Sequence, residues 1–150
     1  FSETFFMFCR CIRAFLLFAL CMALLAVPQL LKDGPLFDGG AYYIFYSQSA
    51  SSNAEITLSN AEDAAKTKRS VRGLTGESTV YANSEKAFSQ AEKYGAKLLF
   101  CESVCGVVNY YYYSPRLGGA VALAGHAVNL HIAVREDGAA VGTPLIFGGY

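Results

Sequence analysis

Hydrophobic residues are concentrated in one long run near the start of the chain. Residues 14–31 (AFLLFALCMALLAVPQLL) contain no charged side chain and one polar residue, Gln29. A helix of this length extends about 27 Å, close to the roughly 30 Å hydrocarbon thickness of a bilayer. The pattern predicts a membrane-targeting helix that begins at about Phe5. We therefore assign residues 1–31 to a membrane anchor or signal segment.

The charges that flank this segment predict its orientation. Arg10 and Arg13 precede the apolar run, whereas Lys32 after it is offset at once by Asp33. The positive-inside rule places the N-terminus in the cytoplasm and the rest of the chain outside. No A-x-A-like cleavage site follows the run, which favours an uncleaved single-pass anchor in the cell membrane. The alternatives are secretion after signal cleavage and a buried helix of a globular core.

Turn-forming residues separate this segment from a second region with alternating patterns. Residues 32–40 (KDGPLFDGG) predict a linker, and residues 41–150 an extracytoplasmic domain. Strands are expected at 41–46 and 76–82, with a loop at 47–54. The stretch 55–72 is ambiguous. It could hold a short helix, and its basic group indicates a solvated segment; that group is Lys66, Lys68, Arg69 and Arg72.

The clearest helix signal outside the membrane segment covers residues 83–94. Asn83 and Ser84 are both good N-caps, Glu85 suits the positive end of the helix dipole, and Gly95 suits a left-handed terminus. One apolar stripe recurs at helical spacing and needs a sheet to cover; it consists of Ala87, Phe88, Ala91 and Tyr94.

The remaining sequence alternates in the manner of an antiparallel sheet. Strand patterns cover 97–104, 107–113, 120–124, 127–135 and 139–147, with hairpin turns expected at Cys105-Gly106 and near Gly125-His126. Residues 128–135 alternate strictly, which predicts one buried and one exposed face. The fold class is therefore α+β: a helix packed on an antiparallel sheet, in the order β-α-β-β-β-β.

Charge argues against nucleic-acid binding. From Asp33 onward the chain has nine Lys and Arg residues against eleven Asp and Glu residues, a balance of about −2. Proteins that neutralise a phosphate backbone usually carry a basic surplus. We expect no nucleic-acid partner for this domain.

The cysteines and histidines do not form a convincing chemical motif. On one extended strand Cys101 and Cys105 would lie about 13 Å apart, too far for a disulfide, so we expect Cys101 to be buried in the core; the alternative is a bridge formed where the backbone folds back within 102–104. Cys9 and Cys11 are apolar filler or, alternatively, lipid-attachment sites. His126 and His131, five residues apart, would fall on opposite faces of a continuous strand. We expect no metal and no cofactor.

Catalytic motifs are also missing from the pattern. The chain contains no G-x-S-x-G elbow, no P-loop and no G-x-G-x-x-G sequence. An enzyme is the less favoured hypothesis. Its most reasonable location would be near Cys101, His126 or His131.

A run of four tyrosines is the most unusual local feature. On a strand, Tyr110 to Tyr113 would place two rings toward the core and two outward. Tyrosine favours protein, glycan or peptide contacts, although cross-strand aromatic packing is an equal alternative. We predict a binding surface that combines the outward tyrosines with a polar row on the following strand: Tyr111, Tyr113, Asn129, His131 and Arg135.

Three segments of the C-terminal half resemble the YwmB-like family of exported proteins from spore-forming Firmicutes. They are YSPRL at 113–117, VNLHIAVR at 128–135 and VGTPLI at 141–146, within a likeness that covers roughly residues 73–150. The resemblance implies a domain like that of the TATA-box-binding protein and a link to sporulation, and transfers no functional residue. We expect a membrane-anchored interaction or structural module with an envelope protein partner.

Overall fold

The computed structural model describes residues 12–24, 34–48 and 54–147, which fall into two units, Phe1–Gly34 and Pro35–Tyr150. In the first unit residues 12–24 form a helix with exposed side chains. Within the described residues, no helix combines the length and hydropathy needed to cross a membrane. The beginning and end of the predicted membrane segment, residues 5–11 and 25–31, lie outside the described residues. Its assignment therefore stays a prediction.

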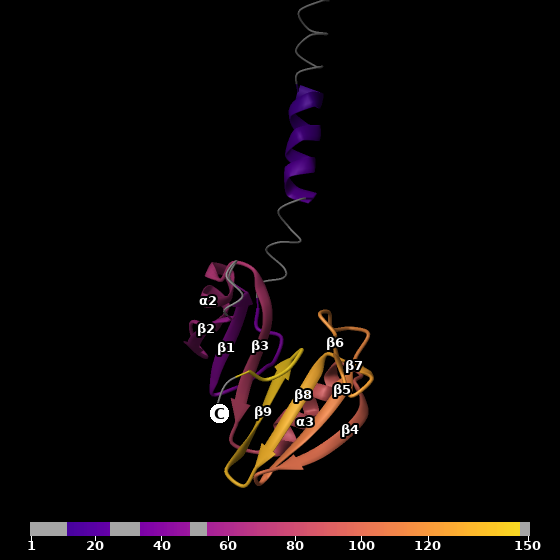
Figure 1. Ribbon diagram of the computed structural model, residues 1–150. Helices are drawn as coiled ribbons and strands as arrows, with labels where there is room; N and C mark the ends of the chain where they lie inside the picture. The colour runs from indigo at the N-terminus through magenta and orange to yellow at the C-terminus, as the bar shows by residue number, and fades with distance from the viewer. Residues whose placement is uncertain (1–11, 25–33, 49–53, 148–150) are drawn as a thin grey trace, which may run out of the picture. The chain divides into compact units, whose positions relative to one another are not determined.

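The second unit is built on a seven-stranded antiparallel sheet, in the spatial order β2-β1-β3-β9-β8-β5-β4 (Figure 1). A separate two-stranded sheet, β6-β7, lies between β5 and β8 in sequence. The predicted α+β class is confirmed. The strands are β1 Tyr42–Gln48, β2 Ala54–Asn60, β3 Leu74–Tyr81, β4 Lys97–Val104, β5 Val107–Tyr113, β6 Val121–Leu123, β7 His126–Val128, β8 Leu130–Arg135 and β9 Gly138–Thr143.

The C-terminal strands form the antiparallel meander that the alternation predicts. In the main sheet β4, β5, β8 and β9 are successive neighbours, and β9 then pairs with β3, the strand that precedes helix α3. The predicted order β-α-β-β-β-β differs from the chain, in which six strands follow α3, because residues 121–128 form the separate β6-β7 hairpin and the predicted strand 127–135 is divided into β7 and β8. The hairpin turn at Cys105-Gly106 is also present, with φ of 52° and 81° at the two residues.

Helix α3, Ser84–Lys93, begins and ends where its caps predict. The Asn83 side chain accepts a hydrogen bond from the Lys86 backbone N–H at 3.2 Å, and Gly95 follows with φ of 58°. Ala87 and Ala91 on its apolar stripe are buried. By contrast, the pattern missed strand β2, which begins at the end of the predicted loop 47–54 and continues into the ambiguous stretch 55–72; that stretch also contains helix α2, Ala64–Ser70.

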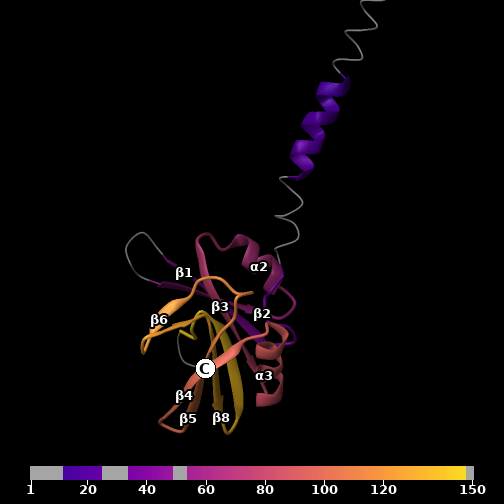
Figure 2. The same cartoon turned by 90° about the vertical axis from the view of Figure 1, so that its right-hand side faces the viewer.

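Both α2 and α3 lie on one face of the sheet, which we call the helix face; the opposite face is the outer face (Figure 2). Side chains that point toward the helices form the core of the unit. The larger cluster includes Phe37, Leu130, Ile132 and Val141, each with no exposed surface. A smaller cluster beneath α2 joins Tyr43, Phe45 and Ala64.

Cys101 is exposed, so the expectation that it lies in the core is wrong. It pairs with Tyr110 and so shares the helix face, but it lies on β4, an edge strand, where the core cluster does not extend to it. Cys21, Cys101 and Cys105 are all free thiols.

Candidate functional site

The four tyrosines alternate between the two faces of β5, as predicted. The Tyr110 ring contacts Phe88 of α3 edge-on, at 5.1 Å between centroids, and Tyr112 belongs to the core. Tyr111 and Tyr113 therefore point to the outer face. Their exposures differ greatly, however: 7% for Tyr111 and 40% for Tyr113. Only Tyr113 of this pair presents its ring to solvent.

Tyr111 is the centre of an aromatic row that crosses three strands. Its ring stacks on Phe100 of β4 and on His131 of β8, with centroid separations of 4.6 Å on each side. His126, in the β6-β7 hairpin, lies 5.6 Å from Phe100 at the other end of the row. The expectation that the two histidines occupy opposite faces of one strand is wrong, because the strand is interrupted at Asn129 and the hairpin turns back.

Both ring nitrogens of His131 are hydrogen-bonded to its own chain. The Ile146 backbone N–H donates to Nδ1 at 3.3 Å, which requires that the proton of the neutral ring is on Nε2. Nε2 then donates to Asn109 Oδ1 at 3.0 Å. Burial lowers the pKa of His131 to about 4, although the nearby Glu102 carboxylate raises it in part. This ring is neutral near pH 7 and already bonded, which suits a structural group.

The segment after β9 covers this part of the outer face. Gly142 lies between Ser78 and His131 in the cross-strand register, and a Cβ placed on it would be 2.8 Å from Ile146 Cγ1. Further along, the Phe147 backbone N–H donates to Tyr46 Oη at 3.1 Å, and the two rings meet edge-on. The face of β8 that is predicted to be exposed is instead buried at His131, which this segment covers, and at Ala133.

Asn129 binds the loop that follows β5. Its Oδ1 accepts from the Ser114 N–H at 2.8 Å, and its Nδ2 donates to the carbonyls of Ser114 and Leu117 at 2.7 and 2.8 Å. The side chain is 1% exposed. All three hydrogen bonds are satisfied within the chain, so Asn129 holds a loop in place and is not displayed for a partner.

The predicted binding residues are thus only partly brought together. Tyr111 and His131 are stacked and buried, and the Tyr111 hydroxyl donates to Glu102 Oε1 at 2.7 Å, whereas Tyr113 and Arg135 are exposed. Arg135 forms an ion pair with Asp137 at 3.2 Å. The polar residues along this part of the chain therefore have three different roles. Asn129 holds a loop, His131 is buried under the segment after β9, and Arg135 is exposed.

The buried His131 predicts an acid-sensitive fold. Between pH 6.5 and about pH 4 the unfolded chain binds a proton at this residue and the folded chain does not, so stability falls as the pH is lowered through this window. The total loss from this group is about 3 kcal/mol, since one pKa unit corresponds to about 1.4 kcal/mol. Urea unfolding of the full chain and of a His131→Gln variant at pH 7 and pH 4.5 measures it. We expect a smaller loss in the variant; equal losses would contradict the assignment.

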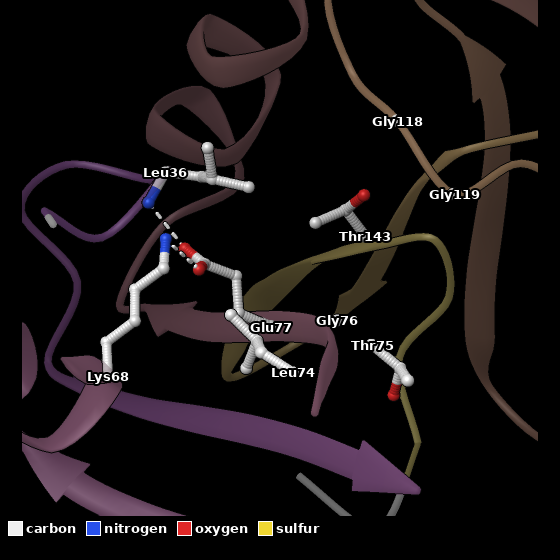
Figure 3. A pocket seen from close by; sticks show the side chains of 9 residues that line it. All are labelled: Leu36, Lys68, Leu74, Thr75, Gly76, Glu77, Gly118, Gly119 and Thr143. Carbon is white, nitrogen blue, oxygen red and sulfur yellow. Dashed lines mark hydrogen bonds and ion pairs between the residues drawn. The ribbon is translucent and has the colours of Figure 1, made fainter. Parts of the chain in front are cut away.

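A second cluster, on the helix face, contains a buried ion pair that the sequence did not single out (Figure 3). Lys68 Nζ of α2 lies 2.6 Å from Glu77 Oε2 of β3, and Glu77 Oε1 accepts the Leu36 backbone N–H. The Glu77 and Lys68 side chains are 1% and 11% exposed. One carboxylate thereby connects β3, α2 and the segment before β1. The basic group at 66–72, which is expected to be solvated, therefore has one member, Lys68, that is largely withdrawn from solvent.

This ion pair lines a cavity of about 270 Å³. Its walls include Gly76, and a Cβ placed there would lie 2.2 Å from the Thr143 carbonyl oxygen, so the backbones approach too closely for any other residue. Lys68 neutralises Glu77, so the pair leaves the cavity without surplus charge. We interpret the pair as a structural connection. The cavity is lined by Leu36, Lys68, Leu74, Thr75, Gly76, Glu77, Gly118, Gly119 and Thr143.

Three exposed large apolar side chains of the second unit lie together on the outer face, on edge strand β2 and the adjoining strand β1. We call Tyr42, Ile56 and Leu58 the apolar edge patch; they are 37%, 49% and 68% exposed. All three point to the same side of the sheet as Ile44. In the cross-strand register Ile44 of β1 pairs with Leu58 of β2 and with Ser78 of β3. Sequence reasoning missed this patch because it did not recognise β2 as a strand.

Comparisons of the chain with protein-family models, with curated proteins and with solved structures give no match. The resemblance to the YwmB-like family therefore stays a prediction from the quoted segments. The function has to be argued from the site geometry.

Proposed function

We propose that this chain is a membrane-tethered interaction or structural module whose domain works outside the cytoplasm. The apolar edge patch carries the proposal. Exposed apolar side chains that gather on one surface, beside a sheet edge, are typical of protein-binding sites. Leu58, at 68% exposure, has the largest exposed fraction among the large apolar side chains of the second unit.

The predicted anchor supports the tethered location. The apolar run at 14–31 is long enough to span a bilayer, and Arg10 and Arg13 orient it with the domain outside. The likeness to the YwmB-like family extends the proposal to a role in sporulation. A tether confines the domain near envelope partners, so that even weak contacts are effective.

The alternative, an exported enzyme near Cys101 or His131, has less support. A nucleophile needs a base within hydrogen-bond reach. Cys101 lies on the helix face beside Tyr110, whereas His131 lies on the outer face beside Tyr111, so the sheet separates the thiol from the imidazole. Both His131 nitrogens are also occupied.

A photo-cross-linking experiment in cells tests the proposal. A benzoylphenylalanine introduced at Leu58 should give discrete protein adducts in the membrane fraction. The matched control position is Val104, which is 51% exposed on the opposite edge strand and should give few adducts. Equal adducts from both positions would contradict the surface assignment. Recovery of a shortened chain in the soluble fraction would contradict the tether.

A further inference from the structure

The two edges of the main sheet differ in how well they can accept another strand. Edge strand β2 lies beside β1 and keeps an unbroken register with it over its seven residues. Edge strand β4 has a register shift between Leu98 and Phe100. A shift of this kind bends a strand and hinders pairing at its free edge. Of the two, β2 is the regular edge.

β2 also lacks the residues that usually protect an edge strand. Its sequence, AEITLSN, has no Lys, no Pro and one charged residue, Glu55. Helix α2 lies on its helix face, where Ser59 Oγ is 3.0 Å from Thr67 Oγ1. On the outer face, Ile56 and Leu58 are exposed. Within the described residues, β2 pairs only with β1.

We propose that β2 pairs antiparallel with β2 of a second copy of this chain, with the two-fold axis at Thr57. A two-fold axis perpendicular to a sheet keeps each face on the same side. Residues that pair across the two β2 strands must then lie on the same face of the sheet, so their sequence positions differ by an even number. The residue midway between them therefore pairs with the same residue of the other copy. Placing Thr57, the middle residue of β2, at the axis uses the whole strand.

This register matches the side chains of the two strands. Ile56 lies opposite Leu58 of the partner subunit, and the converse pair completes an apolar cluster on the outer face. Glu55 lies opposite Ser59 of the partner subunit, so no like charges meet. The two seven-stranded sheets become one continuous sheet.

A strand edge alone buries less area than the roughly 1,200–2,000 Å² of a stable protein interface. The pairing therefore depends on the proposed function, because a membrane tether raises the effective concentration of the two copies. We expect weak association in dilute detergent and strong association in vesicles.

Register-specific cross-linking of the full chain tests the pairing. In a background with all five cysteines replaced by serine, Thr57→Cys should cross-link to itself, since opposite Cβ atoms lie about 5 Å apart. Glu55→Cys and Ser59→Cys should each remain monomeric alone, because their own counterparts lie about 13 Å away. Mixed in one vesicle, they should cross-link to each other. The reagent is a bifunctional thiol cross-linker with a span of about 5 Å.

A charge variant supplies the second arm. Ile56→Lys combined with Leu58→Lys places like charges opposite each other and should reduce the Thr57→Cys dimer at least tenfold; Val104→Lys, at the other edge, should leave it unchanged. Thr57→Cys dimers no more abundant than Val104→Cys dimers would overturn the pairing. If Leu58 captures a different protein while Thr57→Cys stays monomeric, the pairing fails and the proposed function stands. If dimers form but the chain is soluble in cells, the tether fails.

Discussion

Replacing Lys68 with methionine is expected to lower the free energy of unfolding by about 3–5 kcal/mol. The methionine fills similar space but leaves the Glu77 carboxylate, which is 1% exposed, without its cation. Moving an unpaired charge out of water is costly, and the Leu36 N–H alone does not compensate for it. Urea unfolding of the full chain, followed by far-UV circular dichroism, measures the loss.

Two further variants make this prediction specific. Lys66→Met removes an exposed cation from the same helix and should change stability by less than about 0.5 kcal/mol. Combining Lys68→Met with Glu77→Leu removes both charges and should recover most of the loss, since an apolar pair can replace a buried ion pair. The interpretation fails if Lys68→Met and Lys66→Met shift the unfolding midpoint equally.

Replacing Asn129 with alanine is the second large expected effect. The substitution removes three hydrogen bonds; the Ser114 N–H and the Leu117 carbonyl lose Asn129 as partner, whereas the Ser114 carbonyl still accepts from the Leu117 N–H at 3.3 Å. Each unsatisfied buried group costs about 1–3 kcal/mol, so we expect a total of about 3–5 kcal/mol once some groups regain water. We also expect a local effect, because the loop after β5 is no longer held by Asn129.

Asn83 provides a matched control for this prediction. Its side chain accepts a single exposed hydrogen bond at the start of α3, and Asn83→Ala should cost about 1 kcal/mol. Hydrogen exchange adds the local readout: the Ser114 amide should exchange much faster in Asn129→Ala than in Asn83→Ala. Unchanged Ser114 exchange would show that Asn129 does not hold the loop.

The two largest effects both arise at residues for which the sequence pattern predicts no structural role. Lys68 belonged to a basic group, and Asn129 to a polar row that alternation assigned to solvent. Their importance comes from neighbours distant in sequence: nine residues separate Lys68 from Glu77 and fifteen separate Asn129 from Ser114. A pattern within one strand or helix contains no information about which segment will cover it.

What the sequence determined by itself is the local structure and its periodicity. The caps at Asn83 and Gly95 define α3, and the Cys105-Gly106 turn defines a hairpin. Period-two alternation places Tyr110 and Tyr112 on one side of the sheet and Tyr111 on the other. These signals are local, because helix ends, tight turns and strand pleats depend on residues a few positions apart. The α+β class follows from their order.

Only the tertiary structure decided which polar residues are buried and which apolar ones are exposed. The segment after β9 crosses the outer face above Gly142 and buries His131, while Ile56 and Leu58 on β2 stay uncovered at the edge of the sheet. Burial depends on chain that arrives from elsewhere in the fold, whereas alternation reports only the side on which a residue points. For this reason the structure buries part of the predicted binding row, and most of the surface that we propose to bind lies on β2, a strand that the pattern does not predict.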